Sequence, residues 1–476
     1  MTPAAAGAFA AIDLGATSGR VMLGRVSRGE LAVRPIARFP NVPVRTTDGL
    51  HWNVLELYRN AVAGLGAAIR EEPNLISVGV DSWAVDYALM RGSRMLGNPY
   101  HYRDERTADG VRAVHELVDP TELYRQNGLQ HLPFNTLYQL AVDDLGPADR
   151  MLLIPDLIGY WLTGRMVAER TNASTTGLLD IGSGTWNDDL IASLGLPRAI
   201  FPELVDAGTV IGRFHPLVVD EIGGGSAVDV VAVGSHDTAS AVVAIPAQSQ
   251  NFAYISCGTW GLVGVELDAP VLTEQSRSAN FTNEGGVDGR VRFLHNVTGL
   301  WLLNESVRTW ERDGARIDLP RLLGEAAAVS GPISIFDTND SRFLTPGDLP
   351  SRIAHYFAER GEPIPASRAE TVRCIIESLA HAFSAAVDAA SELSGRTVDV
   401  IHLVGGGSQN TLLCQLTANH SGRPVLAGPV EATAIGNILI QARAAGVLSG
   451  ELEDLRALVA SAFPPLRYDP VSPAAR

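Results

Sequence analysis

The first hydrophobic stretches of the chain predict two short strands joined by a tight turn. Residues 9–13 and 21–26 are mostly apolar, and small residues with two glycines lie between them. Apolar runs bounded by glycine-rich turns are typical of a β-hairpin. Residues 254–257 and 262–266 repeat this pattern around a second glycine turn, half a chain length later.

Helical and strand-like patterns alternate along the rest of the chain. Helical periodicity covers residues 54–70, 151–162 and 410–418. Runs rich in β-forming residues cover 77–81, 229–234 and 398–404. Such alternation predicts helices layered on sheets. We therefore expect an α/β fold of two similar domains, residues 1–245 and 246–476, each opening with a strand–turn–strand unit. The proline-rich end, residues 464–476, is expected to be loosely held.

Composition and charge exclude several classes of protein. The 476 residues are 46% hydrophobic and 19% charged, which allows two or three packed domains. The formal charge of −16 repels a phosphate backbone, so nucleic acid is not an expected partner. All 37 basic residues are arginine. Without lysine the chain cannot form a Schiff base or a G-x-x-x-x-G-K-[ST] phosphate loop.

The three cysteines and the start of the chain indicate a cytoplasmic protein. The cysteines lie far apart and form no C-x-x-C pair, which fits a reducing compartment. No basic residue precedes Arg20, so we expect no signal peptide, and no apolar run is long enough to cross a bilayer. The 11 histidines show no H-E-x-x-H spacing, so we expect no built-in zinc site.

The turn of the first hairpin, residues 13–20, has features of an anion site. Its glycines and small residues let backbone N–H groups approach a phosphate, and Asp13 could hold the water shell of Mg²⁺. An ordinary hairpin turn is the alternative. The second turn of the same design, at Gly258, favours a nucleotide phosphate clamp made of two hairpins.

Two other turns are candidate sites. The three glycines of residues 405–407 would suit a flat purine lying on the backbone, although such a run, taken alone, is more often just a tight strand-to-helix turn. In residues 234–240, Ser235 or Asp237 could cap a helix. Alternatively, Asp237 could accept a proton from a substrate hydroxyl.

Residues 79–87 interleave acidic and aromatic side chains, a composition suited to a sugar. The carboxylates of Asp81 and Asp86 could meet hydroxyls, while Trp83 and Tyr87 could cover C–H bonds. The alternative is an edge strand with a buried tryptophan.

Six motifs taken together resemble the FGGY family of carbohydrate kinases. In chain order they are DLGATSGR (13–20), SHDTASA (235–241), SCGTW (256–260), NEGG (283–286), VGGGSQN (404–410) and GPVEA (428–432). The resemblance extends over residues 11–442. It implies an actin-like ATPase fold, in which two ribonuclease-H-like domains enclose a nucleotide and sugar cleft.

The resemblance also implies the site residues. The ATP contacts that it implies are Ala16, Thr17, Ser18, Gly19, Arg20, Thr259, Asn304 and Gly406. The sugar contacts that it implies are Ala84, His236, Asp237, Thr238 and Asn296, with Asp237 as the catalytic base. Ala84, Asn304 and Cys257 stand where similar enzymes usually have Gly, Gln and Ser.

The members that the chain resembles most phosphorylate the 1-hydroxyl of L-rhamnulose with ATP and Mg²⁺. By this resemblance, Asp13 would hold the metal through water, and the partners would be small molecules rather than nucleic acid or membrane. The chain would act as a monomer or homodimer. The alternatives are a kinase for L-fuculose, a xylulose or another ketose, and a non-catalytic actin-like clamp that uses ATP only to change conformation.

Overall fold

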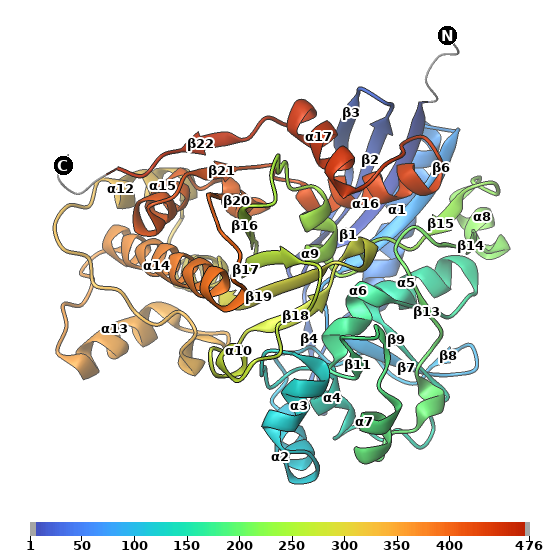
Figure 1. Cartoon of the computed structure of the whole chain (residues 1–476), viewed down its shortest axis with the longest axis horizontal. Coiled ribbons are helices and arrows are strands. Elements are labelled where there is room, and N and C mark those ends of the chain that lie inside the picture. The colour runs from blue at the N-terminus through green and yellow to red at the C-terminus, as the bar shows by residue number, and fades with distance from the viewer. Residues whose placement is uncertain (1–5, 472–476) are drawn as a thin grey trace. The chain divides into compact units, whose positions relative to one another are not determined.

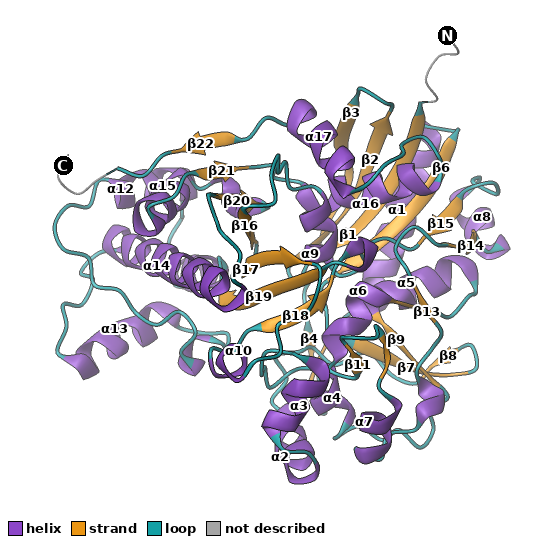
Figure 2. Ribbon diagram, in the orientation of Figure 1, coloured by secondary structure: helices purple, strands orange, loops and turns teal. Residues whose placement is uncertain are grey.

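The computed structural model describes residues 6–471 and divides the chain into two compact units. The first unit comprises the chain up to Gln248 together with Glu266–Phe293 and Glu431–Pro464; the second comprises Ser249–Val265, Leu294–Val430 and the chain from Pro465. Each unit is therefore assembled from segments that are distant in the sequence. Helices and strands alternate in both (Figure 2), as the periodicity predicts.

A six-stranded sheet forms the centre of the first unit (Figure 1). Its order is β14–β15–β6–β1–β2–β3, and its strands are β1 (Gly7–Leu14), β2 (Ser18–Val26), β3 (Leu31–Pro40), β6 (Leu75–Ser82), β14 (Val210–Arg213) and β15 (Asp229–Val231). Strand β1 pairs antiparallel with β2, which confirms the predicted opening hairpin, and parallel with β6.

Helices cover both faces of this sheet. The helices packed on it include α1 (Val54–Glu71), α5 (Ile154–Thr163) and α16 (Ala432–Ala444). A Cβ at Gly64 of α1 would lie 2.5 Å from Val21, whereas a Cβ at Gly24 would lie 2.7 Å from Ile438 of α16. Val21 and Gly24 are three residues apart on β2 and so point to opposite faces. Helices α1 and α16 therefore lie on opposite faces.

The first unit contains further elements outside this sheet and these three helices. They are β4 (Val44–Arg45), β5 (Leu50–His51), β7 (Tyr87–Arg91), β8 (Arg94–Met95), α2 (Thr107–Leu117), α3 (Pro120–Asn127), α4 (Thr136–Leu140), β9 (Arg150–Leu153), β10 (Ala168–Glu169), α6 (Arg170–Ala173), β11 (Leu179–Asp180), β12 (Thr185–Trp186), α7 (Asp188–Ser193), β13 (Leu204–Val205), α8 (Pro216–Ile222), α9 (Asp237–Val243), α10 (Glu274–Ser278), β18 (Thr282–Gly285) and α17 (Leu452–Ala462). Several of them enclose a hydrophobic cluster that includes Leu137, Leu153 and Trp186.

A seven-stranded sheet has the order β18–β19–β17–β16–β20–β21–β22. The strands after β18 are β16 (Phe252–Cys257), β17 (Trp260–Leu267), β19 (Val291–Thr298), β20 (Val400–Val404), β21 (Val425–Ala427) and β22 (Leu466–Tyr468). The second unit also contains α11 (Trp301–Arg312), α12 (Leu319–Ala327), α13 (Leu349–Arg360), α14 (Arg368–Ser394) and α15 (Thr411–Ser421). Strands β16 and β17 pair antiparallel, so the second predicted hairpin is also confirmed.

Two expectations from the sequence are wrong in detail. Residues 151–153 form the end of β9 rather than the start of a helix, because they pair with β7, and α5 begins at Ile154. Within the proline-rich end, Leu466–Tyr468 pairs antiparallel with β21 rather than lying loose, while residues 472–476 fall outside the described chain. Between residues 6 and 471, no helix is both long and apolar enough to cross a membrane.

Candidate active site

The carboxyl ends of β1 and β6 bring three distant segments of the first unit together. The Trp83 N–H donates to the Leu14 carbonyl at 3.2 Å, and the Ser82 N–H donates to the Ser235 carbonyl at 2.9 Å. The carboxyl ends of parallel strands are the usual ligand-binding edge of an α/β sheet. The predicted phosphate loop, Ala84 and the His236 segment therefore meet at one edge.

The loop between β1 and β2 is held by Asn41, a residue that the sequence did not indicate. The Gly15 N–H donates to the Ser18 carbonyl at 2.9 Å, which closes the turn. The backbone N–H of the buried Asn41 donates to the Thr17 carbonyl at 3.0 Å, and its Nδ2 donates to the Gly15 carbonyl at 2.9 Å. Ala16 and Thr17 are half-buried and Ser18 is exposed, so the loop has a fixed shape and an open face.

Arg20 lies beside Asp13 rather than projecting into solvent. Its Nε donates to Asp13 Oδ2 at 2.8 Å, and its Nη1 pairs with Glu431. Burial alone would lower the pKa of Arg20, but these two carboxylates raise it above its usual value. The predicted phosphate-loop arginine is therefore fixed by two acidic side chains.

Asp13 and Asp81 lie opposite each other in the register of β1 and β6. Burial raises the pKa of Asp81 well above its usual value, and the neighbouring Asp13 carboxylate raises it further. Asp81 Oδ2 accepts a hydrogen bond from Asn437 at 2.6 Å, whereas its buried Oδ1 has no hydrogen-bond partner among residues 6–471. A fully buried acid with a raised pKa tends to keep its proton, so Asp81 is a poor metal ligand and Asp13 is the carboxylate that this edge offers to a cation.

These residues do not form a complete cage for a metal. No cluster of three or more His, Cys, Asp or Glu side chains suited to a metal ion occurs in the described part of the chain. Mg²⁺ commonly uses only one or two carboxylates and completes its shell with waters and substrate phosphates. Asp13 alone therefore fits a Mg²⁺ ion held through water.

Neither Ser235 nor Asp237 caps α9. The helix begins at Asp237, and the residue at its N-cap is His236, which makes no side-chain capping bond. The Ser235 hydroxyl instead donates to Oε2 of the buried Glu169 at 2.8 Å. The capping alternative is therefore wrong, and the Asp237 side chain is not needed to start the helix.

The Asp237 carboxylate has one oxygen engaged by its neighbours. The Thr238 hydroxyl donates to Asp237 Oδ1 at 3.3 Å, and His236 Nε2 lies 3.5 Å from the same oxygen. The side chain is 31% exposed, in contrast to the buried residues on either side. Burial raises the pKa of Asp237, His236 opposes this and Asp13 adds to it. A raised pKa makes this carboxylate a better proton acceptor.

Behind His236 lies a buried ion pair. Glu284, on β18, and Arg292, on β19, lie 3.2 Å apart, and both contact Nδ1 of His236. Burial alone would raise the pKa of Glu284, but Arg292 and His236 hold it below its usual value. Glu284 belongs to a motif noted in the sequence. Arg292 was missed, and its signal was a charged residue inside the apolar run 291–294.

The carboxylates of Asp81 and Asp86 cannot contact a sugar, so that part of the sequence interpretation is wrong. Asp81 is 0% exposed and Asp86 1% exposed. Asp86 Oδ2 accepts hydrogen bonds from Trp52 Nε1 at 2.6 Å and Trp83 Nε1 at 3.0 Å, and Oδ1 accepts from Gln139 Nε2 at 2.9 Å. The tryptophan is buried, as the alternative interpretation of residues 79–87 held, but β6 lies between β15 and β1 and is not an edge strand.

Ala84 is the residue that this segment exposes. It is half-buried, whereas Trp83, Val85 and Asp86 are buried. Val85 adopts a φ of 66°, which is strained for a β-branched side chain, and the Thr136 hydroxyl donates to its carbonyl at 2.7 Å. Asp86 and Thr136 thus hold a strained bend that presents Ala84 at the edge of the sheet.

In the second unit, the turn of the second hairpin is bound to the start of α11. The Leu300 N–H donates to the Gly258 carbonyl at 3.0 Å, and the Trp301 N–H donates to the Thr259 carbonyl at 3.1 Å. Asn304 lies one turn further along α11, where its N–H bonds the Leu300 carbonyl. Thr259 and Asn304 are therefore on connected elements. Asn296 lies on β19, half-buried.

The glycine turn after β20 also borders the second hairpin. Gly405 has a φ of 81°, which favours glycine, and a Cβ there would lie 3.0 Å from the Cys257 carbonyl oxygen. Gly406 is exposed, has no positive φ and has open space where a Cβ would be. The geometry of the turn therefore explains why residue 405 is glycine, but it does not explain why residue 406 is glycine. A glycine at position 406 is expected if a flat ligand lies on the backbone there.

Two family models match nearly all of the chain. The N-terminal domain of the FGGY family of carbohydrate kinases matches residues 8–244, and the C-terminal domain of that family matches residues 253–445. The chain belongs to the FGGY family of carbohydrate kinases. It is therefore a sugar kinase, a phosphotransferase of a family that uses ATP, and the resemblance seen in the six motifs is confirmed.

Curated relatives of this FGGY kinase match it over almost its whole length. The rhamnulokinase of Bacteroides thetaiotaomicron is 40% identical over 98% of the chain and 96% of the relative. The rhamnulokinases of Pectobacterium atrosepticum and Pectobacterium carotovorum are 42% and 43% identical, over 97% of the chain and 92% of each relative.

Solved structures of FGGY kinases share the fold. A ligand-bound xylulose kinase from Lactobacillus acidophilus has a TM-score of 0.77 at 17% identity, over 98% of the chain and 94% of that structure. A Plasmodium falciparum glycerol kinase with ADP also has a TM-score of 0.77, at 13% identity, over 98% of the chain and 95% of that structure. The expected actin-like α/β class, with two ribonuclease-H-like domains, is confirmed.

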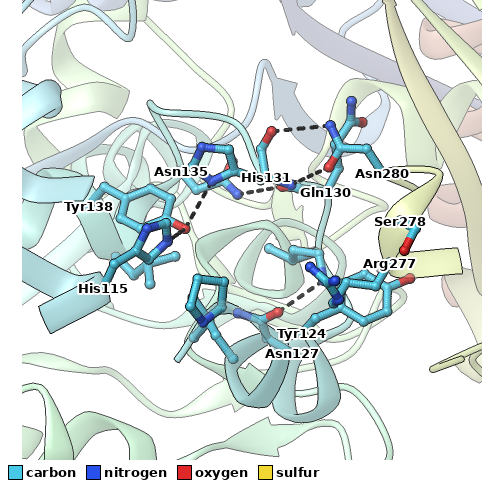
Figure 3. Close-up of a pocket in the computed structure, with 14 residues that line it drawn as sticks. His115, Tyr124, Asn127, Gln130, His131, Asn135, Tyr138, Arg277, Ser278 and Asn280 are labelled. Atoms are coloured by element: carbon cyan, nitrogen blue, oxygen red, sulfur yellow. Dashed lines mark hydrogen bonds between the residues drawn. The ribbon is translucent and has the colours of Figure 1, made fainter. Parts of the chain in front are cut away.

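Figure 3 shows a pocket of this FGGY kinase that none of the predicted site residues lines. It has a volume of about 520 Å³ and is lined mainly by α3, the loop between α3 and α4, α4 itself and the end of α10. The Tyr138 hydroxyl lies between His115 Nε2, at 3.1 Å, and His131 Nδ1, at 3.2 Å. Burial lowers the pKa of both histidines. These three polar groups are therefore bonded to one another.

Proposed function

We propose that this kinase transfers the γ-phosphoryl group of ATP to the 1-hydroxyl of L-rhamnulose. The observation that carries the proposal is the 40 to 43% identity, over nearly the whole chain, to three relatives named rhamnulokinase. Local geometry supports it, because Asp237 is a partly exposed carboxylate with a raised pKa at the edge where the sugar segment and phosphate loop meet.

Asp237 is the proposed base. Because Oδ1 already faces Thr238 and His236, Oδ2 would accept the proton of the attacking hydroxyl as phosphoryl transfer proceeds. In such transfers the carboxylate mainly orients the hydroxyl, and proton loss is late. Ala84, His236, Thr238 and Asn296 would contact the sugar.

Two phosphate turns and the glycine turn form the proposed nucleotide site. The contacts are those implied by the motifs: Ala16, Thr17, Ser18, Gly19, Arg20, Thr259, Asn304 and Gly406. Mg²⁺ would be held near Asp13 through water, and when bound it would neutralise charge on the phosphates. Arg20, paired with Asp13 and Glu431, would keep the Asp13 carboxylate oriented.

The matches of the two family models support a division of roles between the two halves of the chain. Residues 1–245 would carry the sugar contacts, the first phosphate turn and Asp237, and residues 246–476 the second phosphate turn and the adenosine contacts. We further propose that the enzyme acts in the cytoplasm, as a monomer or homodimer.

A substrate panel tests the proposal. ADP release is measured with L-rhamnulose, L-fuculose, L-xylulose, D-xylulose and glycerol at equal concentrations, and the product is identified by phosphorus NMR. We expect the highest kcat/KM for L-rhamnulose and a phosphate on C1. Stereoisomers should be rejected more strongly than chain-length analogues, because a misplaced hydroxyl leaves buried polar groups unpaired.

The other results have defined meanings. A higher kcat/KM for another ketose would assign a sibling activity to the same site. A slow ATPase reaction with no phosphorylated sugar would favour the non-catalytic clamp.

A further inference from the structure

Arg292 is a cation in the interior of the first unit. It lies on β19 between Val291 and Phe293 and is 0% exposed. Burying an arginine is costly unless its N–H groups and charge are satisfied. Its Nε donates to the Gly285 carbonyl at 3.0 Å, and its Nη2 lies 3.2 Å from Glu284 Oε2. Glu284 therefore balances the charge of Arg292.

The remaining contact of Arg292 Nη2 is with a ring nitrogen. Nη2 lies 3.1 Å from Nδ1 of His236, in hydrogen-bonding geometry. A guanidinium is always protonated in proteins and can only donate. Nδ1 must therefore accept, which requires that it carries no proton.

The proton of a neutral His236 ring then lies on Nε2. In an imidazole, the bond made by one nitrogen decides which tautomer is present. Nε2 faces Asp237, at 3.5 Å from Oδ1. The competing contact, from Nδ1 to Glu284 Oε2, is longer at 3.3 Å and lacks hydrogen-bond alignment. It defines the alternative tautomer, in which Nδ1 donates to Glu284, and the shorter, aligned contact to Arg292 favours the tautomer with its proton on Nε2.

We propose that Arg292 is a positioning residue of the sugar site, which holds His236 as the tautomer with its proton on Nε2. The inference rests on the proposed function of that site. His236 then presents a donor on the side of Asp237 and cannot take the proton of the attacking hydroxyl. The imidazole orients Asp237 Oδ1 or a sugar oxygen, and proton acceptance is left to Asp237.

The direct test is the tautomer itself. Long-range ¹⁵N–¹H correlation spectra of the histidine-labelled enzyme distinguish a protonated Nε2 from a protonated Nδ1, and the His236 signals are identified by their loss in His236→Gln. We expect the Nε2–H pattern in the wild-type enzyme, and in Arg292→Met its loss or a mixture of tautomers. A wild-type Nδ1–H pattern would overturn the proposal.

Two further variants separate positioning from the loss of a buried charge. Arg292→Gln keeps an N–H donor in place of the guanidinium and should partly restore the Nε2–H pattern. Arg373→Met is the matched control, because Arg373 is 7% exposed and its Nε donates to Glu377 on the same helix, α14, at 2.9 Å. It should lower thermal stability but leave the His236 signals unchanged. A change of these signals in Arg373→Met equal to that in Arg292→Met would count against the proposal.

Kinetics give the second readout. Arg292→Met should lower kcat with the preferred ketose by about tenfold to a hundredfold, the usual size for a residue that orients a histidine ligand. ADP affinity should stay unchanged. An unchanged kcat in a folded Arg292→Met enzyme would refute the positioning role. If the spectra show Nε2–H while no ketose is phosphorylated, the proposed function fails and the tautomer assignment stands.

Discussion

A Cβ atom at Gly407 would lie 2.4 Å from Cys257 Sγ, so the glycine turn after β20 packs directly on the end of β16. Cys257 is fully buried, and Gly407 is buried beside it. The neighbouring Gly406 has open space at the same position. Packing against Cys257 therefore explains the glycine at position 407, whereas packing does not explain the glycine at position 406.

This contrast predicts that alanine at position 407 lowers stability, whereas alanine at position 406 affects ATP binding. Gly407→Ala should destabilise the protein by about 1 to 3 kcal/mol, the usual cost of overpacking. Gly406→Ala should change stability by less than about 0.5 kcal/mol, but should raise the KM for ATP several-fold, because the new methyl group would occupy the surface proposed for the purine. Denaturant unfolding and ATP titration check both. An unchanged KM in Gly406→Ala would remove Gly406 from the nucleotide site.

The fold could be predicted from the sequence where a local pattern decides the structure. Both hairpins follow from short apolar runs around glycine turns, and the first helix from its periodicity. The sequence could not show that Glu431–Pro464 belongs to the first unit, because α16 packs there through contacts made across the length of the chain. Residues 151–153 were misassigned because a short apolar run fits a strand or a helix equally well.

For the candidate site, the sequence indicated residues only where they belong to a recognisable motif. Residue type suggested that Asp86 meets a sugar, yet its partners, Trp52 and Gln139, are distant in sequence and bury it. Asn41 and Arg292 were missed for the same reason, since each acts through a contact with another segment. Local sequence identifies candidate chemistry, whereas burial and long-range hydrogen bonds decide which groups are available.

Asn41→Ala should weaken ATP binding without altering the sugar site. The substitution removes the Nδ2 bond to the Gly15 carbonyl and leaves the backbone bond to Thr17 in place. One such bond is worth about 1 kcal/mol, which corresponds to about a fivefold rise in the KM for ATP. Asn53→Ala, which removes the N-cap of α1, is the control and should affect stability alone. Equal effects of both variants on KM would show that the phosphate loop does not depend on Asn41.

Asp86 should make stability depend on pH in a direction unusual for a carboxylate. Burial raises its pKa to about 6 despite the donors around it. Below a pH of about 4, the pKa of an aspartate in the unfolded chain, Asp86 is protonated in both the folded and the unfolded state, and its contribution to folding stability is fully present. This contribution is lost as the pH rises through the pKa of Asp86 in the folded state. A difference of about 2 between the folded and unfolded pKa values corresponds to about 3 kcal/mol of stability.

The comparison with Asp86→Asn isolates this contribution. Urea unfolding at several pH values gives the stability of the wild type minus that of the variant, and we expect the difference to fall by about 3 kcal/mol between about pH 4 and 7. Asp189→Asn, at an exposed site on α7, is the control for a general charge effect. A pH-independent difference for Asp86→Asn would contradict a buried, proton-retaining carboxyl group.

Asp237→Asn should abolish most turnover while the protein stays folded. Loss of a general base usually costs about a hundredfold to ten-thousandfold in kcat. Sugar binding should persist, because the amide keeps the shape of the carboxylate and α9 needs no cap from this side chain. A large fall in melting temperature with turnover retained would indicate a structural role instead.

The pH profile provides the sharper test of the same residue. The base must be ionised to accept a proton, so kcat/KM should rise with pH through the pKa of Asp237, which burial and Asp13 place above the usual value of about 4. Asp86, with a pKa of about 6, also titrates in this range and belongs to the bend at Ala84, so it could produce an acid limb of its own. Profiles of two variants separate them. The limb should survive in Asp86→Asn and disappear from the residual activity of Asp237→Asn; the opposite result would assign the acid limb to the buried bend and leave Asp237 without a role as base.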